Sequence, residues 1–222
     1  MARGEPPSPR WAGVFTPLAE VLTQHALPLK LLEDLLSAFE QDVNVTRYAD
    51  RPALLDYCRR SANPIGRLLL HLYGVSDELA LQQSDAICTA LQLINFWQDP
   101  SVDLPRGRSY FTKQDLARHG LTTADVLRGS DTAATQAMLR ELCDWAEALM
   151  RQGSPLVFSL RGRMGWELRL VVQGGLRVLE RIRAMDHRTL GARPRLTTLD
   201  APVLLWRALC MKRPPSRQGA GA

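Results

Sequence analysis

The sequence predicts an all-α protein with one domain. Nearly every long segment places apolar residues three and four positions apart, which is the spacing of an amphipathic helix. No segment shows the alternating pattern of a half-buried strand, and proline and glycine separate the helical segments. A chain of 222 residues, 45% hydrophobic and 23% charged, can bury a sizeable core. We expect the domain to cover residues 13–211, between a disordered N-terminus, 1–12, and a disordered basic tail, 212–222.

The first three helices are predicted from their start signals. Thr16 and Pro17 can cap and open a short helix that ends near His25, because threonine is a good N-cap and proline fits the first helical position. Pro28 begins a second helix, and Asp50 caps a third. The apolar stripe of the second helix consists of Leu31, Leu32, Leu35, Leu36, Phe39 and Val43.

The later helices follow from the same kinds of signal. Ser76 caps a fourth helix, and the next residues, Asp77 and Glu78, suit the positive end of the helix dipole. Two short helices end at Gly120 and Gly129, since glycine readily takes the left-handed conformation that closes a helix. The ranges predicted after the fourth helix are 113–119, 123–128, 131–152, 163–184 and 200–211.

Composition argues against several classes of protein. The four cysteines are widely spaced without a CxxC pair, and the four histidines are equally scattered, so we expect neither a zinc site nor a disulfide framework. No apolar run approaches the roughly 18 residues that a membrane-spanning helix needs. The N-terminal residues lack the apolar core of a secretory signal. The expected location is therefore the cytoplasm.

The charge is concentrated in the C-terminal third. The chain carries a net charge of +5, and the part from Arg161 onward holds 13 Arg or Lys residues and only 4 Asp or Glu residues. Such a basic region favours an anionic partner, such as a phosphorylated substrate or a lipid surface. A solvated, arginine-rich helix face is the alternative. No motif of a nucleic-acid-binding domain accompanies the charge, and we expect no nucleic-acid partner.

The fourth helix carries the most informative pattern. Gln92, Asn95, Asp99 and Asp103 fall on one narrow face when each residue advances by about 100°. The residues around them are almost all apolar, which is the inverse of an ordinary surface helix. Because burying carboxylates without partners is costly, this stripe predicts a polar cavity inside a helical bundle.

Two carboxylates four residues apart on one helix face can share a metal ion. Asp99 and Asp103 offer the hard oxygen ligands that Mg²⁺ prefers, with phosphate oxygens and water completing its shell. Pro100 must kink or end the helix between them. A helix cap or a solvated turn is the alternative for such a pair. The cations and donors that could hold a phosphate follow directly: Arg106, Arg108, Tyr110 and Lys113.

Two segments carry a resemblance to a known family. The segment LQLINFWQDPSVDLPRGRSYF resembles the second aspartate-rich motif of the squalene/phytoene synthases, and YCRRSANPIGRLLLHLYG is similar to their Tyr-Cys…Gly helix. The resemblance runs from about Leu27 to Met211. With SANPIGR, NFWQD and ELRLVVQGGLRVLERI, the chain most resembles the bacterial hopanoid-pathway subgroup of squalene and hydroxysqualene synthases.

The resemblance implies a fold, a cofactor and a set of roles. The implied fold is the isoprenoid synthase helical bundle, the cofactor is Mg²⁺, and the substrate is presqualene or farnesyl diphosphate. Asp99 and Asp103 match the metal-binding pair. The other matched residues are Gln92 and Asn95 along the cavity, Arg108 facing diphosphate, Tyr110 near the reacting carbons, and Tyr57 with Gly66 on the Tyr-Cys helix, where glycine leaves room for a prenyl chain.

The chain also departs from the family pattern. It has Gln98 where many relatives have arginine, and residues 1–30 contain no earlier aspartate-rich motif. We therefore expect an N-terminally truncated member that lacks the first helices and is a poor catalyst alone. The expected reaction ionises presqualene diphosphate to hydroxysqualene. The alternatives are the head-to-head condensation of two farnesyl diphosphates, or an inactive helical fragment that acts as an interaction module.

The C-terminal segment APVLLWRALCMKRPP couples an apolar helix to basic residues. This combination suggests a reversible, peripheral contact with the inner face of the membrane, made by the apolar side chains together with Lys212, Arg213 and Arg217. The alternative interpretation is that the apolar side chains of this helix are simply part of the core. They are Leu204, Leu205, Trp206 and Leu209.

Overall fold

The computed structural model describes residues 9–212, and within that range the chain is helical with one isolated bridge, between Arg47 and Ser109. The all-α prediction is confirmed. The α-helices are α1 Ala12–Gln24, α2 Leu29–Asn44, α3 Arg51–Ser61, α4 Asn63–Leu72, α5 Glu78–Gln98, α6 Pro100–Asp103, α7 Lys113–Arg118, α8 Thr123–Leu127, α9 Ala133–Gly153, α10 Gly162–Ala184 and α11 Ala201–Leu209. The 3₁₀ turns are η1 Pro9–Trp11, η2 Leu104–Arg106, η3 Ser154–Phe158 and η4 Thr198–Asp200.

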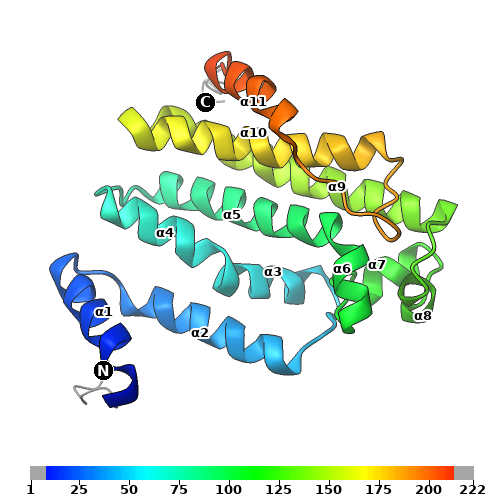
Figure 1. Ribbon diagram of the computed structural model, residues 1–222, viewed down its shortest axis with the longest axis horizontal. Helices are drawn as coiled ribbons and strands as arrows, with labels where there is room; N and C mark the ends of the chain where they lie inside the picture. The colour runs from blue at the N-terminus through cyan, green and yellow to red at the C-terminus, as the bar shows by residue number, and fades with distance from the viewer. Residues whose placement is uncertain (1–8, 213–222) are drawn as a thin grey trace, which may run out of the picture.

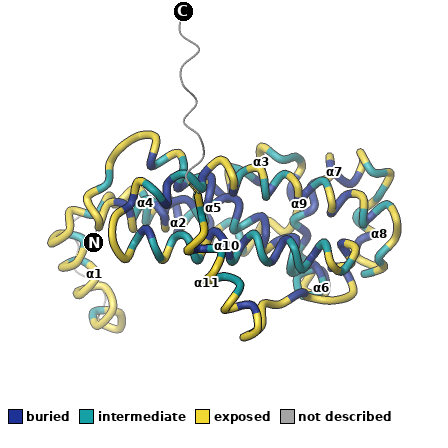
Figure 2. Tube along the Cα trace, turned by 90° about the horizontal axis from the view of Figure 1, so that it is seen from above, coloured by how far each residue is buried: buried dark blue, intermediate teal, exposed yellow. Residues whose placement is uncertain are grey.

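Helix α5 is the centre of the bundle. It packs most extensively against α9 and also contacts α3, α4, α10 and η3. Figure 1 shows α2, then α3 with α4, then α5, and then α9 with α10 stacked in order, with α11 lying against α10. The buried residues of Figure 2 follow the same central helices, and they include Ile87, Leu93, Ile94 and Trp97 of α5.

The α5–α9 contact depends on a glycine. Gly153, the last residue of α9, lies so close to α5 that a Cβ atom there would sit 2.4 Å from the Gln83 carbonyl oxygen and 2.9 Å from the Ile87 nitrogen. Both obstacles are backbone atoms, which cannot turn away as a side-chain end can. The approach of the two helices is therefore set by the absence of a side chain at this position.

Several helix starts and ends agree with the sequence analysis. The Asp50 side chain accepts a hydrogen bond from the Ala53 N–H and caps α3. Gly120 and Gly129 follow α7 and α8 with φ of +65° and +67°, the left-handed conformation expected of them. Pro28 immediately precedes α2, as expected.

Other helix starts are shifted from the prediction. Asp77, not Ser76, caps α5 by accepting from the Ala80 N–H. Thr132 caps α9, whereas Asp131 accepts hydrogen bonds from the Leu190 and Gly191 N–H groups of a distant loop. In both places two neighbouring residues could cap the helix, and local sequence alone does not choose between them.

The N-terminal helix begins earlier than predicted. α1 starts at Ala12 and contains Pro17, so Thr16 is not its cap. Pro17 lies in the second turn, where it removes only the bond to the Gly13 carbonyl. Residues 9–12, expected to be disordered, form η1 and the start of α1. The rest of the two expected disordered segments, residues 1–8 and 213–222, lies outside the described residues.

The apolar stripe predicted for α2 is only partly core. Leu35 is buried, but Leu36, Phe39 and Val43 are 60%, 56% and 80% exposed. Leu36 and Phe39 line an open groove between α1 and α2, and helix α1, at the edge of the bundle in Figure 1, leaves them largely exposed. In the described part of the chain, no helix is both long enough and apolar enough to cross a membrane.

The glycine contact yields a stability prediction. Gly153→Ala should lower the free energy of unfolding by about 1–3 kcal/mol, because the added methyl group forces α5 and α9 apart. Gly174→Ala in α10 is the matched control. Nothing lies within 4 Å of its Cβ position, so alanine should stabilise the helix slightly. Chemical denaturation measures both variants, and a Gly153→Ala chain as stable as the Gly174→Ala chain would contradict the packing argument.

Candidate active site

The site begins where α5 ends. The helix stops at Gln98, Asp99 is its C-cap, and Pro100 opens the short helix α6. The kink predicted at Pro100 is confirmed. The Asp103 N–H still donates to the Asp99 carbonyl oxygen at 2.9 Å, so the helical path continues across the kink. The two aspartates therefore stay one turn apart at the end of the central helix.

The two carboxylates differ in their surroundings. Partial burial and the neighbouring charge of Asp99 raise the pKa of Asp103, against the opposing effect of Arg108, Arg106 and Arg193. Asp99 is held by Arg193, whose Nε and Nη2 atoms donate to its two oxygens, the second at 2.9 Å. Arg193 comes from the segment between α10 and α11, and the sequence analysis missed it because it lies 94 positions away.

The donor set fits a magnesium ion that is shared with a ligand. Among the described residues, no group of three or more His, Cys, Asp or Glu side chains could hold a metal ion. The pair alone supplies two hard oxygen donors that repel each other when both are ionised. Mg²⁺ commonly takes one or two carboxylates and completes its shell with water and phosphate oxygens. Asp99 and Asp103 fit that kind of ion.

Arg108 and Tyr110 lie beside Asp103. A small pocket is lined by Asp103, Arg108, Tyr110 and Phe96. The rings of Phe96 and Tyr110 stack with centroids 3.7 Å apart and planes 9° from parallel. Arg108 Nη2 donates to the backbone oxygen of Asp42 at 3.4 Å, which ties this segment to the end of α2.

Tyr57 joins Tyr110 in an aromatic cluster that also contains Tyr48. The ring centroid of Tyr48 lies 5.6 Å from that of Tyr57 and 6.0 Å from that of Tyr110. Burial raises the pKa of all three hydroxyls, and the carboxylate of Asp42 raises each of them further. The sequence analysis missed Tyr48 and Asp42. They reach the cluster because the chain beside Tyr48 pairs with the chain before α7.

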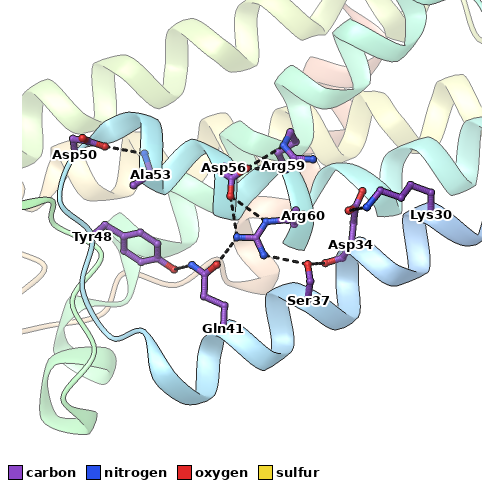
Figure 3. Close-up of polar contacts among 10 residues, drawn as sticks. All are labelled: Lys30, Asp34, Ser37, Gln41, Tyr48, Asp50, Ala53, Asp56, Arg59 and Arg60. Carbon is purple, nitrogen blue, oxygen red and sulfur yellow. Dashed lines mark hydrogen bonds and ion pairs between the residues drawn. The ribbon is translucent and has the colours of Figure 1, made fainter.

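The Tyr48 hydroxyl has a defined direction. Figure 3 shows Arg60 of α3 between Asp56 and Gln41, with Gln41 reaching Tyr48. A guanidinium only donates, so the Gln41 oxygen must face Arg60 and its amide nitrogen must face Tyr48. Gln41 Nε2 donates to the Tyr48 oxygen at 3.3 Å. The hydroxyl hydrogen of Tyr48 is therefore directed away from Gln41.

The other sequence-predicted residues are not all gathered at this pocket. Gln92 is half-buried and Asn95 is exposed on α5, so the polar stripe opens toward solvent along part of its length. Lys113 is exposed at the first position of α7. None of these three lines the small pocket around Asp103 and Tyr110.

Gly66 lies at a second, apolar cavity of about 300 Å³. A Cβ atom at Gly66 would sit 2.4 Å from Ser84 Oγ and 2.6 Å from Cys88 Sγ, so the glycine lets α4 approach α5 and also leaves the cavity open. The cavity lies between α4, α5, η3 and α10. Its lining includes Ile65, Leu69, Ile87, Leu91, Leu160, Met164 and Leu168.

The chain is similar in sequence to proteins of one known family. The chain matches the family model described as squalene/phytoene synthase over residues 2–200, whereas its motifs carried the resemblance only from Leu27. A hydroxysqualene synthase of Sinorhizobium fredii is 29% identical over 171 residues, which are 76% of this chain and 58% of that protein. A phytoene synthase of Thermus thermophilus is 29% identical over 95% of this chain and 76% of that protein.

The fold agrees with a solved structure. The squalene synthase HpnC from Alicyclobacillus acidocaldarius superposes with a TM-score of 0.75 at 34% identity, covering 78% of this chain and 66% of that chain. The chain spans 58% of the length of the first curated relatives that it matches.

The aromatic cluster predicts an unusual alkaline titration. Tyr48 and Tyr57 should stay neutral in the folded chain at about pH 11, where an ordinary tyrosine with a pKa of about 10 is mostly ionised, and the pKa of Tyr110 should also lie above its ordinary value. Since these pKa values are raised by folding, the unfolded chain releases the protons first. The free energy of unfolding should therefore fall as the pH rises above about 10.

Tyrosinate absorbance of the native chain, compared with the same chain in denaturant, measures this effect. Tyr57→Phe should remove one group that titrates at high pH. The pKa values of Tyr48 and Tyr110 should stay raised in this variant. Complete ionisation of the native tyrosines near the ordinary pKa would show that the cluster is open to water.

Proposed function

Because this chain belongs to the squalene/phytoene synthase family, we propose that it binds a prenyl diphosphate, with the diphosphate at Asp99 and Asp103 and the prenyl chain in the apolar cavity beside Gly66. One observation carries the proposal. A single helix, α5, borders the apolar cavity with its middle turns and ends at the carboxylate pair. Few ligand classes require both surroundings at once.

The spacing along α5 suits such a substrate. Leu91 lines the cavity and Asp99 caps the helix eight residues later, which corresponds to about 12 Å along the axis. A molecule with a charged head and an extended hydrocarbon chain can span that distance. The apolar lining, and the small glycine within it, favour isoprenoid chains over polar ligands.

Asp99 and Asp103 would hold Mg²⁺ together with the diphosphate. The bound ion would supply charge neutralisation to the leaving group as its bond to carbon breaks. Arg106, Arg108 and Arg193 are the guanidinium groups whose charges act on Asp103, and a guanidinium can donate two parallel hydrogen bonds to phosphate oxygens. To donate to the phosphate, Arg193 would release the Asp99 carboxylate and bind the diphosphate in its place.

The aromatic residues would act on the carbon that becomes positively charged as its bond to the diphosphate breaks. The faces of Phe96 and Tyr110 carry the negative potential that attracts a cation, and they lie beside Asp103 in the same pocket. Tyr57 and Tyr48 extend this aromatic wall. Tyrosine hydroxyls are neutral near pH 7 and burial raises these pKa values further, so the wall adds no full negative charge that would capture the carbocation.

We propose as the specific reaction that presqualene diphosphate loses diphosphate, rearranges and takes up water to give hydroxysqualene. The 29% identity to a hydroxysqualene synthase supports it. The second candidate is the head-to-head condensation of two farnesyl diphosphates to presqualene diphosphate or squalene, which the 34% identity to the squalene synthase HpnC supports. Incubating the chain with each diphosphate and Mg²⁺, followed by mass spectrometry of the products, distinguishes the two.

The first functional prediction concerns metal binding. Asp103→Asn should weaken the joint binding of Mn²⁺ and inorganic diphosphate by about tenfold or more, because one of two hard oxygen donors is lost. Release of diphosphate from presqualene diphosphate should fall by about 100-fold or more. Electron paramagnetic resonance of free Mn²⁺ measures binding without any turnover.

The matched control is Asp186→Asn. Asp186 has a side chain that is 79% exposed and a φ of 51°, a conformation that asparagine tolerates. It should bind Mn²⁺ and diphosphate like the parent chain. Equal loss in both variants, or no loss in either, would argue against a metal site at the end of α5.

Arg193→Ala should change the affinity for Mn²⁺ alone and the affinity for Mn²⁺ with diphosphate in opposite directions. The variant should bind Mn²⁺ alone more tightly, because the guanidinium no longer competes for Asp99. It should bind the Mn²⁺–diphosphate pair less tightly, because a cation beside the phosphates is lost. Titrations with and without diphosphate measure the two effects, and a change of the same sign in both would contradict the proposed exchange.

A further inference from the structure

The outward face of α11 is apolar. Trp206 is 68% exposed, Leu209 is 63% exposed and Leu205 is 47% exposed, and Pro202 lies on the same exposed face one turn earlier. Figure 2 shows exposed residues along this helix, which lies at the edge of the bundle against α10. An ordinary surface helix directs its polar side chains to this position.

The inward face of α11 holds the one charge within the helix. Arg207 Nη1 donates to Glu180 of α10 at 2.6 Å, and Ala208 is fully buried beside it. This face of the helix is attached to α10 by an ion pair and a small residue, while Leu205, Trp206 and Leu209 are exposed to solvent. The interpretation of Leu205, Trp206 and Leu209 as core residues is wrong for these three side chains.

The exposed surface continues beyond the helix. Leu199 of η4 is 82% exposed and Leu196, just before it, is 38% exposed. Asp200, between these leucines and α11, is buried and bound to Arg177 and Arg181 of α10, so it adds no negative charge to the surface. The C-terminal apolar surface, as defined here, consists of Leu196, Leu199, Pro202, Leu205, Trp206 and Leu209.

The sequence that follows this surface is basic. Residues 201–222 contain no Asp or Glu and four Arg or Lys residues, of which Arg207 is paired with Glu180, and Arg213 and Arg217 lie outside the described residues. Lys212 is exposed at the end of the described chain, three residues after α11. We propose that the C-terminal apolar surface binds reversibly to anionic lipid, with Trp206 and the leucines entering the headgroup region and Lys212 facing the lipid phosphates.

Lipid fits this surface better than a second copy of the chain. A stable protein interface uses about 20–30 residues on each side, and this surface offers six. Tryptophan is enriched where one end of a side chain is in hydrocarbon and the other meets water. The proposal rests on residues 196–212 alone, and it would stand if the chemistry proposed for the end of α5 were wrong.

The other exposed apolar face differs in charge. Leu36 and Phe39 of α2 are 60% and 56% exposed, close to the values of Leu209 and Trp206. Residues 12–44, however, contain five Asp or Glu residues and one Lys. An anionic lipid surface repels that face and attracts the one at α11. The two faces therefore form a natural test pair.

The experiment is co-sedimentation of the full 222-residue chain with vesicles of phosphatidylglycerol and phosphatidylcholine, and with vesicles of phosphatidylcholine alone. The double variant Trp206→Ser/Leu209→Ser should lose about tenfold or more of its binding to the anionic vesicles. The matched control, Leu36→Ser/Phe39→Ser, should bind like the parent chain. Lys212→Gln should lower binding by about fivefold, and added salt should do the same.

Thermal unfolding of each variant checks that the fold is retained, which the exposure of all four side chains leads us to expect. Equal loss in the two double variants would mean unspecific apolar adhesion and would overturn the proposal. Unchanged vesicle binding by Trp206→Ser/Leu209→Ser would overturn it as well. If that variant instead converted a dimer to a monomer in analytical ultracentrifugation, with no effect on vesicles, the surface would be a contact between two copies.

Discussion

The burial of α5 is the constraint on which the rest of this structure depends. The helix is apolar around most of its circumference, so it must be covered by neighbours on nearly every side. Close approach to α9 is allowed by Gly153, and close approach to α4 is allowed by Gly66. Water can therefore meet α5 chiefly near its ends and along the short stretch around Asn95.

That constraint places two carboxylates at the C-terminal end of the helix. Carboxylates are costly inside a packed core, and Asp99 and Asp103 follow directly after the buried Phe96 and Trp97. Their charge is met by arginines that come from later segments, which explains why Asp99 can be partly buried. The aromatic cluster behind them is assembled from α3, α5 and the two paired segments around Tyr48 and Tyr110. The site thus joins a rigid helix end to loops that the rest of the chain holds.

Local signals in the sequence predicted the start or end of a helix correctly where only one residue could cap or end that helix. Asp50 caps α3, Pro100 ends α5, and Gly120 closes α7, each as expected from its own chemistry. These signals gave the wrong start where two neighbouring residues could both cap the helix. The helix predicted over 131–152 begins later than expected, because the backbone of residues 190–191 uses the Asp131 carboxylate and Thr132 caps the helix.

The sequence by itself determined the helical class, the family and the carboxylate pair at the end of the fourth predicted helix. Each of these depends on residues close together in the chain, where periodicity and spacing carry the information. Only the tertiary structure decided that Arg193 meets Asp99, that Tyr48 joins Tyr57 and Tyr110, and that α11 turns its apolar face outward. Periodicity shows which side chains share a helix face. It does not show what that face packs against, because the answer lies in segments far away along the chain.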